Sequence, residues 1–319
     1  MFDRYNIRNL VRVVRNLELV MGEKRRIRRD FIRHSIKAAS YYYSYCGPTH
    51  RVHVMDQDWD NLLIMDAARY DISLKKFNRS FDVEAKFSKG SWSGEFIDKN
   101  FTGKYHDTIY ITANPHLDRV ESGTFYLAIN LLKKEWDSKY RTVRPEDAAE
   151  VARTVKDDHP NKRIIVHFMQ PHFPFINKNS ERIQQQGIED HLPNQDQKSE
   201  PNPWFDLLWG DENNPKEVIK AYISNYDTIV PIVQELGKDM HGKSIITSDH
   251  GNLLGERLFP IPIKGYGHPI GLHKPELLKV PWIKIDSDSR PNIYSELPVK
   301  NNKNALTVNE EQLRALGYT

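Results

Sequence analysis

Short apolar runs alternate with amphipathic segments along the chain from residue 51 onward. Apolar runs of strand length, bounded by polar residues, lie at 61–66, 107–114, 163–169, 243–250 and 280–285. Segments with apolar residues at helical spacing lie between them, at 67–77, 145–159 and 215–236. Strands that alternate with helices predict an α/β fold, with a mostly parallel central sheet and helices on both of its faces.

The first 50 residues follow a different pattern. Apolar residues at helical spacing over 7–45 predict one or two helices, which Gly47 and Pro48 end. We therefore divide the chain into an N-terminal helical arm, residues 1–50, and a main domain, residues 51–319. An amphipathic, aromatic-rich arm also favours packing on a second copy of the chain, so a homo-oligomer is one expectation.

The charge is nearly balanced over the 319 residues, at +3, but it is uneven along the chain. Residues 25–34 hold five arginines, which form either a solvated helix face or a contact with an anionic membrane surface or polyanion. Small net charge and the lack of nucleotide-binding motifs exclude nucleic acid as an expected partner. Cys46 is the only cysteine, and no apolar run is long enough to span a bilayer. We expect a cytoplasmic protein, with a peripheral membrane contact as an addition.

Carboxylates and imidazoles follow the predicted strands, at the edge where open parallel sheets bind ligands. They are Asp66 and Arg69 after the first strand, His172 after the third, Asp249 and His250 after the fourth, and His268 and His273 further on. Singly, an aspartate after a strand more often caps a helix, and a histidine is more often structural. Together, two carboxylates and an imidazole make a mixed oxygen and nitrogen site that suits Mn²⁺, Mg²⁺, Zn²⁺ or Ca²⁺.

Three segments carry a resemblance to a known family. "DWDNLLIMDAARYD" at 58–71, "TSDHGNLLGE" at 247–256 and "GHPIGLHKPELLKVPWI" at 267–283 resemble, in order and spacing, the sulfatase-like members of the alkaline phosphatase superfamily. The likeness is nearest to archaeal sulfatase-like proteins and extends to the tail at 310–318, which resembles their closing helix. It implies an alkaline phosphatase-like fold and metal-assisted transfer of a phosphoryl or sulfuryl group through a Ser, Thr or formylglycine nucleophile.

The family places its nucleophile at a helix start after the first strand–helix unit, which here is "KGSWSGEFIDKNF" at 89–101. The resemblance therefore assigns Ser93 as the nucleophile, with Ser91 as the second candidate. Either serine could instead be only a helix N-cap. In the segment "YITANPH", the resemblance assigns Asn114 and His116 to the substrate pocket, although an asparagine before a proline is equally typical of a turn.

The nucleophile segment departs from the pattern of formylglycine-dependent sulfatases. Those enzymes carry a Cys/Ser-x-Pro-x-Arg motif, which "SWSGEF" does not match, and Cys46 lies outside this region. A plain serine hydroxyl suits phosphate or phosphonate esters better than sulfate esters.

The metal set also departs from the two-metal members. Those add an Asp with a His four residues later, whereas here Asp227 is followed by Pro231. The resemblance therefore implies one divalent ion per chain, as in lipoteichoic-acid-synthase-like phosphotransferases. Its ligands would be Asp66, Ser93, Asp249 and His250, with His268 as a further candidate.

These inferences predict a metal-dependent hydrolase or transferase of phosphate, phosphonate or sulfate esters. Its expected substrate is an anionic ester, which could be a surface glycan, a lipid head group or a small molecule. Arg69, His172 and His273 would bind this substrate or move protons. The alternative is a degenerate member that binds an anionic glycan or lipid without turnover, and a serine hydroxyl beside the metal ligands would favour catalysis.

Overall fold

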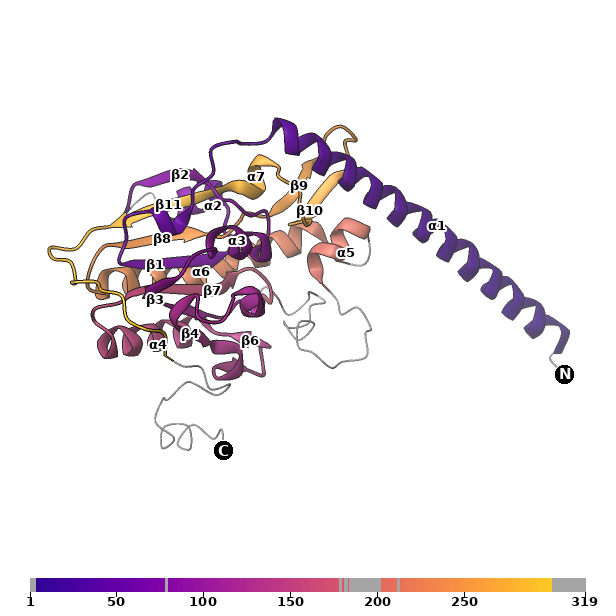
Figure 1. Ribbon diagram of the computed structural model, residues 1–319. Coiled ribbons are helices and arrows are strands. Elements are labelled where there is room, and N and C mark those ends of the chain that lie inside the picture. Colours follow the sequence, from indigo (N-terminus) through magenta and orange to yellow (C-terminus); the bar gives the residue numbers. More distant parts are fainter. Residues whose placement is uncertain are drawn as a thin grey trace.

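The computed structural model describes residues 4–77, 80–177, 180, 183, 202–210 and 213–299, and their side chains from residue 23 onward. Its centre is a seven-stranded sheet in the order β2–β11–β8–β1–β7–β3–β4 (Figure 1). The strands are β1 (Asn61–Asp66), β2 (Val83–Phe87), β3 (Tyr105–Thr112), β4 (Phe125–Asn130), β7 (Arg163–Pro171), β8 (Ser244–Ser248) and β11 (Lys279–Ile285).

The five neighbouring strands from β8 to β4 are parallel, and β11 is antiparallel to both β8 and β2. This confirms the expected mostly parallel sheet. The apolar runs predicted four of the parallel strands and β11, but not β2 and β4, which form the two edges. Two small antiparallel sheets add β5 (Trp136–Asp137) with β6 (Thr142–Val143), and β9 (Leu253–Arg257) with β10 (Lys264–Gly267).

Helices cover both faces of the sheet, as predicted. Helices α4 and α6 pack on one face, and α3 lies on the other (Figure 1). The helices of the main body are α2 (Tyr70–Phe77), α3 (Ser93–Asn100), α4 (Pro145–Asp158), α5 (Pro203–Trp209), α6 (Pro215–Asp239) and α7 (Pro275–Leu278). Short 3₁₀ turns are η1 (Val54–Asp56), η2 (Pro115–Arg119) and η3 (Leu131–Lys133).

The apolar run of β1 is continuous because the strand is buried on both faces. Leu63 and Met65 belong to the core cluster under α4 and α6, whereas Leu62 and Ile64 pack with Phe96 of α3. Side chains alternate between the faces of a strand, so Asp66 falls on the α3 side. The residue that ends the run is therefore presented to the helix that begins with Ser93.

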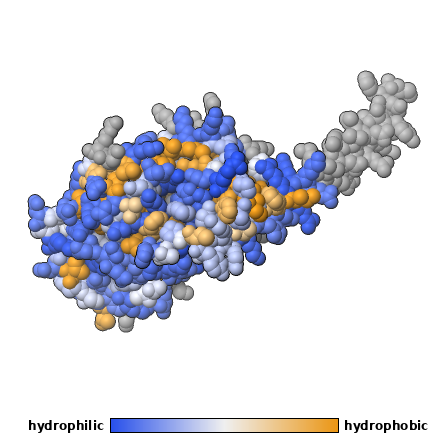
Figure 2. Space-filling model, turned by 90° about the horizontal axis from the view of Figure 1, so that it is seen from above, coloured by the Kyte–Doolittle hydropathy of each residue, from blue (hydrophilic) through white to orange (hydrophobic). Residues whose placement is uncertain are grey.

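Helix α1 (Arg4–Cys46) is a single helix that extends away from the body at its N-terminal end (Figure 1). It ends where the Gly47 amide donates to the Tyr43 carbonyl oxygen at 2.9 Å. Ile32 and Ala39 are buried against the body, while Ile27 and Phe31 are exposed. Figure 2 shows apolar side chains along this helix, close to the body. No helix within the described residues is both long and apolar enough to cross a membrane.

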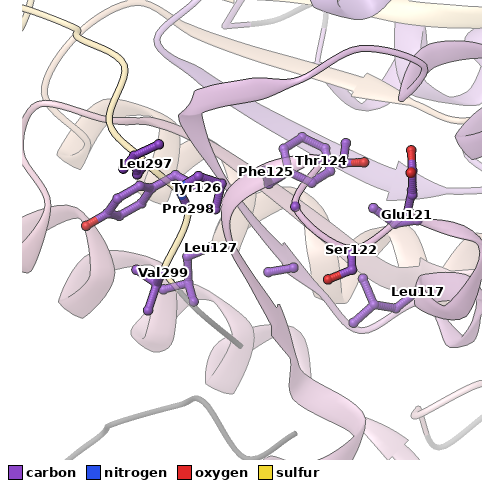
Figure 3. Close-up of a pocket in the computed structure, with 13 residues that line it drawn as sticks. Leu117, Glu121, Ser122, Thr124, Phe125, Tyr126, Leu127, Leu297, Pro298 and Val299 are labelled. Carbon is purple, nitrogen blue, oxygen red and sulfur yellow. The ribbon is translucent and has the colours of Figure 1, made fainter. Parts of the chain in front are cut away.

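The last described residues lie against the edge strand β4. The Val299 amide donates to the Tyr126 carbonyl oxygen at 2.9 Å. A cavity of about 510 Å³ is lined by residues 117, 120–128 and 297–299 (Figure 3). None of the predicted site residues lines this cavity. The predicted closing helix at 310–318 lies outside the described residues.

Candidate metal centre

Two aspartates meet at the ends of the neighbouring strands β1 and β8. Asp66 ends β1 and Asp249 directly follows β8. The chain turns sharply after Asp66, where Ala67 has a φ of 58°, a left-handed conformation that is uncommon for alanine. Asp249 Oδ1 stabilises the turn by accepting from the Ala67 amide at 3.0 Å and from the His250 amide at 2.8 Å. One oxygen of Asp249 therefore holds the backbone, and Oδ2 is left for another partner.

His250 points a ring nitrogen at both carboxylates. Its Nδ1 lies 2.7 Å from the Gly251 carbonyl oxygen, which can only accept, so Nδ1 carries the proton. Nε2 then presents its lone pair and lies 3.5 Å from both Asp66 Oδ1 and Asp249 Oδ2. This tautomer is the one that a metal-binding imidazole needs.

His167 is a member of the cluster that the sequence analysis did not assign to the site. It is fully buried in the middle of β7, with Nε2 3.4 Å from Asp249 Oδ2 and Nδ1 3.0 Å from the Tyr110 hydroxyl. A signal for it existed, because His167 is two residues beyond Ile165, which faces α3. A histidine on the inward side of a central strand thus reaches the same edge as Asp66.

Three unpartnered atoms converge at this point. Asp66 Oδ1, His167 Nε2 and Asp249 Oδ2 are buried without a hydrogen bond, and the three residues offer ligand atoms within 4.8 Å of one another. A buried polar atom without a partner costs free energy, and a buried charge costs more. A bound cation would satisfy all three at once. This donor set fits a divalent metal ion, with no preference between Mn²⁺, Mg²⁺, Zn²⁺ and Ca²⁺ fixed by the residue types alone.

The two carboxylates differ in their acidity. Burial, and secondly the charge of Asp249, raise the pKa of Asp66 well above its usual value. Burial acts in the same direction on Asp249, but the neighbouring imidazoles of His250 and His167 outweigh it and lower the pKa of Asp249. The raised pKa of Asp66 reflects the free-energy cost of a second negative charge beside Asp249, and a bound cation would reduce that cost.

Ser93 is the candidate nucleophile that reaches this cluster. Its Oγ lies 3.3 Å from Asp66 Oδ2 and 3.4 Å from His250 Nε2, and the side chain is buried at the first residue of α3. Ser91 is used elsewhere, because its amide and hydroxyl donate to Glu95 Oε2 at 2.8 and 2.9 Å. The structure thus separates two serines that the sequence analysis left as alternatives.

The segment of Asn114 also reaches the cluster, as expected. Asn114 Nδ2 donates to Asp66 Oδ2 at 2.8 Å, and its Oδ1 accepts from the His116 amide at 3.0 Å. The His116 ring stands edge-on to Trp92, with 5.2 Å between ring centres. Asn114 therefore orients Asp66 and begins η2, while its assignment to substrate stays a prediction.

Two further imidazoles line up beside His250. The ring centre of His268 lies 4.6 Å from that of His250 and 5.0 Å from that of His172. Burial and the neighbouring His250 and His172 lower the pKa of His268 well below its usual value. His268 lies outside the group of three converging ligand residues, so its assignment as a ligand stays a prediction.

Arg69 and His273 belong to other networks. The Arg69 guanidinium binds Asp71 through two hydrogen bonds of 2.8 Å and Glu256 Oε1 at 2.6 Å. His273 Nε2 lies 2.8 Å from Glu95 Oε1. Both side chains are engaged by carboxylates, and neither is among the atoms that converge with Asp66 and Asp249.

Comparisons with known proteins point to one group of folds. No protein-family model matches the sequence, and no curated protein matches it. Solved structures to which the chain is similar include the zinc complex of the C-terminal periplasmic domain of EcEptC from Escherichia coli, at 12% identity, 72% coverage of each chain and a TM-score of 0.44. Another is the integral membrane protein lipooligosaccharide phosphoethanolamine transferase A from Neisseria meningitidis, at 8% identity, 72% coverage of this chain and a TM-score of 0.45.

A third similar structure is the lipoteichoic acid synthase LtaP from Listeria monocytogenes, at 11% identity, 75% coverage of this chain and a TM-score of 0.40. The chain spans 47% of the Neisseria protein and 66% of LtaP. A protein of the alkaline phosphatase superfamily from Vibrio parahaemolyticus is also similar, at 13% identity and a TM-score of 0.39. At these identities the likeness concerns the fold and carries no statement about activity.

The expected cytoplasmic location is contradicted by these comparisons. The EcEptC structures are of a periplasmic domain, so the cytoplasmic expectation was wrong and is withdrawn. Its basis was weak in physical terms. One cysteine excludes an internal disulfide on either side of a membrane, and so it does not distinguish the two compartments.

Proposed function

We propose that this protein is a metal-dependent hydrolase or transferase that acts on phosphate esters through Ser93. The observation that carries the proposal is the convergence of unpartnered Asp66 Oδ1, His167 Nε2 and Asp249 Oδ2 beside the Ser93 hydroxyl. Phosphonate and sulfate esters remain in the substrate class. Phosphate is preferred because the serine lies outside a formylglycine motif.

The cation would be held by Asp66, Asp249 and the imidazoles of His167 and His250. When bound, it would lower the pKa of the serine hydroxyl and neutralise charge on the ester oxygens. Asn114 keeps Asp66 oriented through its 2.8 Å hydrogen bond, and the Gly251 carbonyl oxygen keeps the His250 lone pair directed at the site. These supports act on the ligands rather than on the substrate.

Ser93 supplies the nucleophile. Its Oγ would form a bond to phosphorus while the bond from phosphorus to the ester oxygen breaks. With the His250 lone pair directed at the cation, Asp66 Oδ2 is the acceptor in reach of the hydroxyl proton, which is then available to the departing oxygen. Water, or the hydroxyl of an acceptor, would attack phosphorus in turn and release Ser93.

The alternative is a protein that binds an anionic glycan or lipid without turnover. A metal site with no serine hydroxyl nearby would favour that alternative. Ser93 Oγ at 3.3 Å from Asp66 favours catalysis instead. His172, His268 and His116, which border the cluster, would then contact the substrate or carry protons. Whether the acceptor is water or a glycan or lipid hydroxyl is left open by this proposal.

The test uses p-nitrophenyl phosphate, a phosphodiester, a phosphonate and a sulfate ester, each with Mn²⁺, Mg²⁺, Zn²⁺ and Ca²⁺. We expect metal-dependent turnover of a phosphate ester. Ser93→Ala should lower kcat at least about 10³-fold, because the bond-forming oxygen is lost.

Ser91→Ala, two residues before the first residue of α3, is the matched control. It should keep activity within about threefold and lose about 1 kcal/mol of stability, because it only removes a hydrogen bond to Glu95. Equal losses in the two variants would contradict the assignment of Ser93. Metal binding without turnover of any ester or transfer to any tested acceptor would favour the binding-only alternative.

A further inference from the structure

A second cavity lies on the side of α3 away from the metal centre. It has a volume of about 630 Å³ and is lined by Thr49, Arg51, His53, Lys89, Asp98, Lys99 and Thr102. Asp98 and Lys99 are five and six residues beyond Ser93, which places them on roughly the opposite face of the helix at 100° per residue. None of the converging ligand residues lines the cavity. Its size is that of sites for small organic ligands.

The walls of this cavity carry cationic groups in excess of carboxylates. Asp98 is already paired, since its Oδ1 accepts from Arg119 Nε at 3.0 Å. Lys99 is paired with Glu95 Oε1 at 2.5 Å. Two cations remain, Arg51 and Lys89, and neither has a carboxylate within ion-pair distance in the described part of the chain.

The free donors of these two cations can be identified. Arg51 makes one hydrogen bond among the described residues, from Nε to the Pro48 carbonyl oxygen at 3.1 Å, which leaves its two terminal nitrogens. The Lys89 ammonium makes no hydrogen bond there. Burial lowers the pKa of Arg51, and the charge of Glu95, which lies beyond ion-pair distance, offsets this only in part. A half-buried guanidinium without an ion pair is a strong partner for an oxyanion.

His53 adds an imidazole to the wall of this cavity. Its Nδ1 is buried and makes no hydrogen bond among the described residues, and Asp56 Oδ1, at 3.4 Å, is its ion-pair partner when the imidazole is protonated. Burial, and then the charge of Lys89, lower the pKa of His53. The cavity thus combines an unsatisfied imidazole nitrogen with uncompensated positive charge, and the hydroxyls of Thr49 and Thr102 add neutral donors.

We propose that this cavity binds an organic molecule bearing a phosphate or sulfate group. Arg51 and Lys89 bind the oxyanion, Thr49 and Thr102 contact the polar remainder, and His53 Nδ1 gains a partner. The cavity is too large for one inorganic anion alone, which is why an organic ester is preferred. The ligand would join residues 49–53 to both ends of α3.

The experiment is calorimetric titration of the full chain with glycerol 3-phosphate in EDTA, with inorganic phosphate as the second probe. Without a divalent cation, binding here is independent of turnover at Ser93, so this proposal and the proposed function can fail separately. We expect glycerol 3-phosphate to bind at least tenfold more weakly to the double variant Arg51→Gln, Lys89→Gln. Ser93→Ala should bind glycerol 3-phosphate with the same affinity as the wild type.

Lys284→Gln is the matched control, because this exposed lysine pairs with Glu84 on the edge of the sheet. It should leave the affinity unchanged. Single variants, Arg51→Gln and Lys89→Gln, keep the test usable if the double variant does not fold. No binding by the wild type, or equal binding by all cavity variants, overturns the proposal. If the wild type binds inorganic phosphate as tightly as glycerol 3-phosphate, the proposal of an organic ligand is overturned, and the result is an adventitious ion only.

Discussion

Asp66 is a buried carboxylate, and among the described residues its ion-pair contact is with the imidazole of His250, at 3.5 Å. Its folded-state pKa is raised, so the folded protein holds the proton more tightly than the unfolded chain does. Its contribution to stability is therefore favourable at low pH and is lost as the pH rises through the folded-state pKa. At neutral pH, without a cation, Asp66 is a source of instability.

We expect Asp66→Asn to be more stable than the wild type at pH 7 in EDTA, by about 1–3 kcal/mol. The amide keeps an oxygen for Asn114 and Ser93 and removes the unpaired charge. At pH 3, below the unfolded-state pKa of about 3.9, the difference should nearly vanish, because the wild-type carboxyl is then mostly protonated in both states. Thermal unfolding at both pH values checks this, with the exposed Asp286→Asn as control. A variant less stable than wild type at pH 7 in EDTA would contradict it.

At the level of single residues, strand ends were the useful signal. Asp66, Asp249 and His250 were predicted from their positions after apolar runs, and the structure brings them together. His167 was missed because the search looked beyond the strands and not within them. Arg69 and His273 were assigned to substrate, yet each is bound to a carboxylate that lies far away in the sequence.

Helix α3 is the element that presents Ser93, and Glu95 ties its start to the body. Glu95 accepts from the Ser91 amide and hydroxyl and binds His273 and Lys99. Burial alone would raise the pKa of Glu95, but the hydrogen bonds to His273 and Lys99 outweigh burial and lower it. A lowered pKa stabilises the fold above the unfolded-state pKa of about 4.3, and the stabilisation is lost below that pH.

Glu95→Gln should therefore destabilise the protein by about 1.5–3 kcal/mol at pH 7, the range for hydrogen bonds to a charged group. The loss should shrink at pH 3.5, where the wild type begins to lose the same interactions. Urea unfolding at the two pH values measures it. Glu84→Gln, which breaks an exposed ion pair with Lys284, is the control. A loss that is equal at both pH values would argue against the ionic role of Glu95.

Among the elements, those buried on both faces were predictable and the edge strands were not. β1, β7 and β8 are continuous apolar runs because helices cover both sides of the sheet. β2 reads "VEAKF", and its exposed residues Glu84 and Ala85 point to opposite faces of this edge strand. Such short segments of mixed polar and apolar residues have no distinct hydrophobic period. Whether they form a strand depends on hydrogen bonding to the neighbouring strand.

Considered as a whole, the molecule brings three strands and a helix to one point. Asp66 comes from β1, His167 from β7, Asp249 from the end of β8 and Ser93 from α3. A cation there would join segments that lie up to 183 residues apart, as in the pair Asp66 and Asp249. Binding only to the folded state stabilises it by mass action, about 2.7 kcal/mol at 100 times Kd.

We expect a saturating divalent cation to raise Tm by about 5 °C, and EDTA to reverse the rise. Differential scanning calorimetry with each of the four cations measures this and indicates which is preferred. Asp249→Asn should abolish the shift and His167→Asn should reduce it. An equal shift in Asp249→Asn would place the cation elsewhere.

The sequence by itself determined the fold class, the central strands and most of the residues of the candidate metal centre. A strand that is buried on both faces has a continuous apolar sequence, and an aspartate directly after it is therefore easy to recognise in the sequence. These are local signals, readable without knowledge of partners. The likeness of three segments to a family added the expected role of a serine at the start of α3.

Only the tertiary structure shows that Ser93 contacts Asp66 while Ser91 contacts Glu95, that His167 lies beside Asp249, and that Arg69 and His273 pair with Glu256 and Glu95. Each of these depends on which side chain meets which across a large sequence separation. Ser91 lies four residues before Glu95, and Ser93 lies two residues before it. The hydroxyl of Ser91 nevertheless donates to Glu95, whereas that of Ser93 donates to Asp66. The cavity behind α3 is likewise a product of packing, because its cations come from two segments that are adjacent only in space.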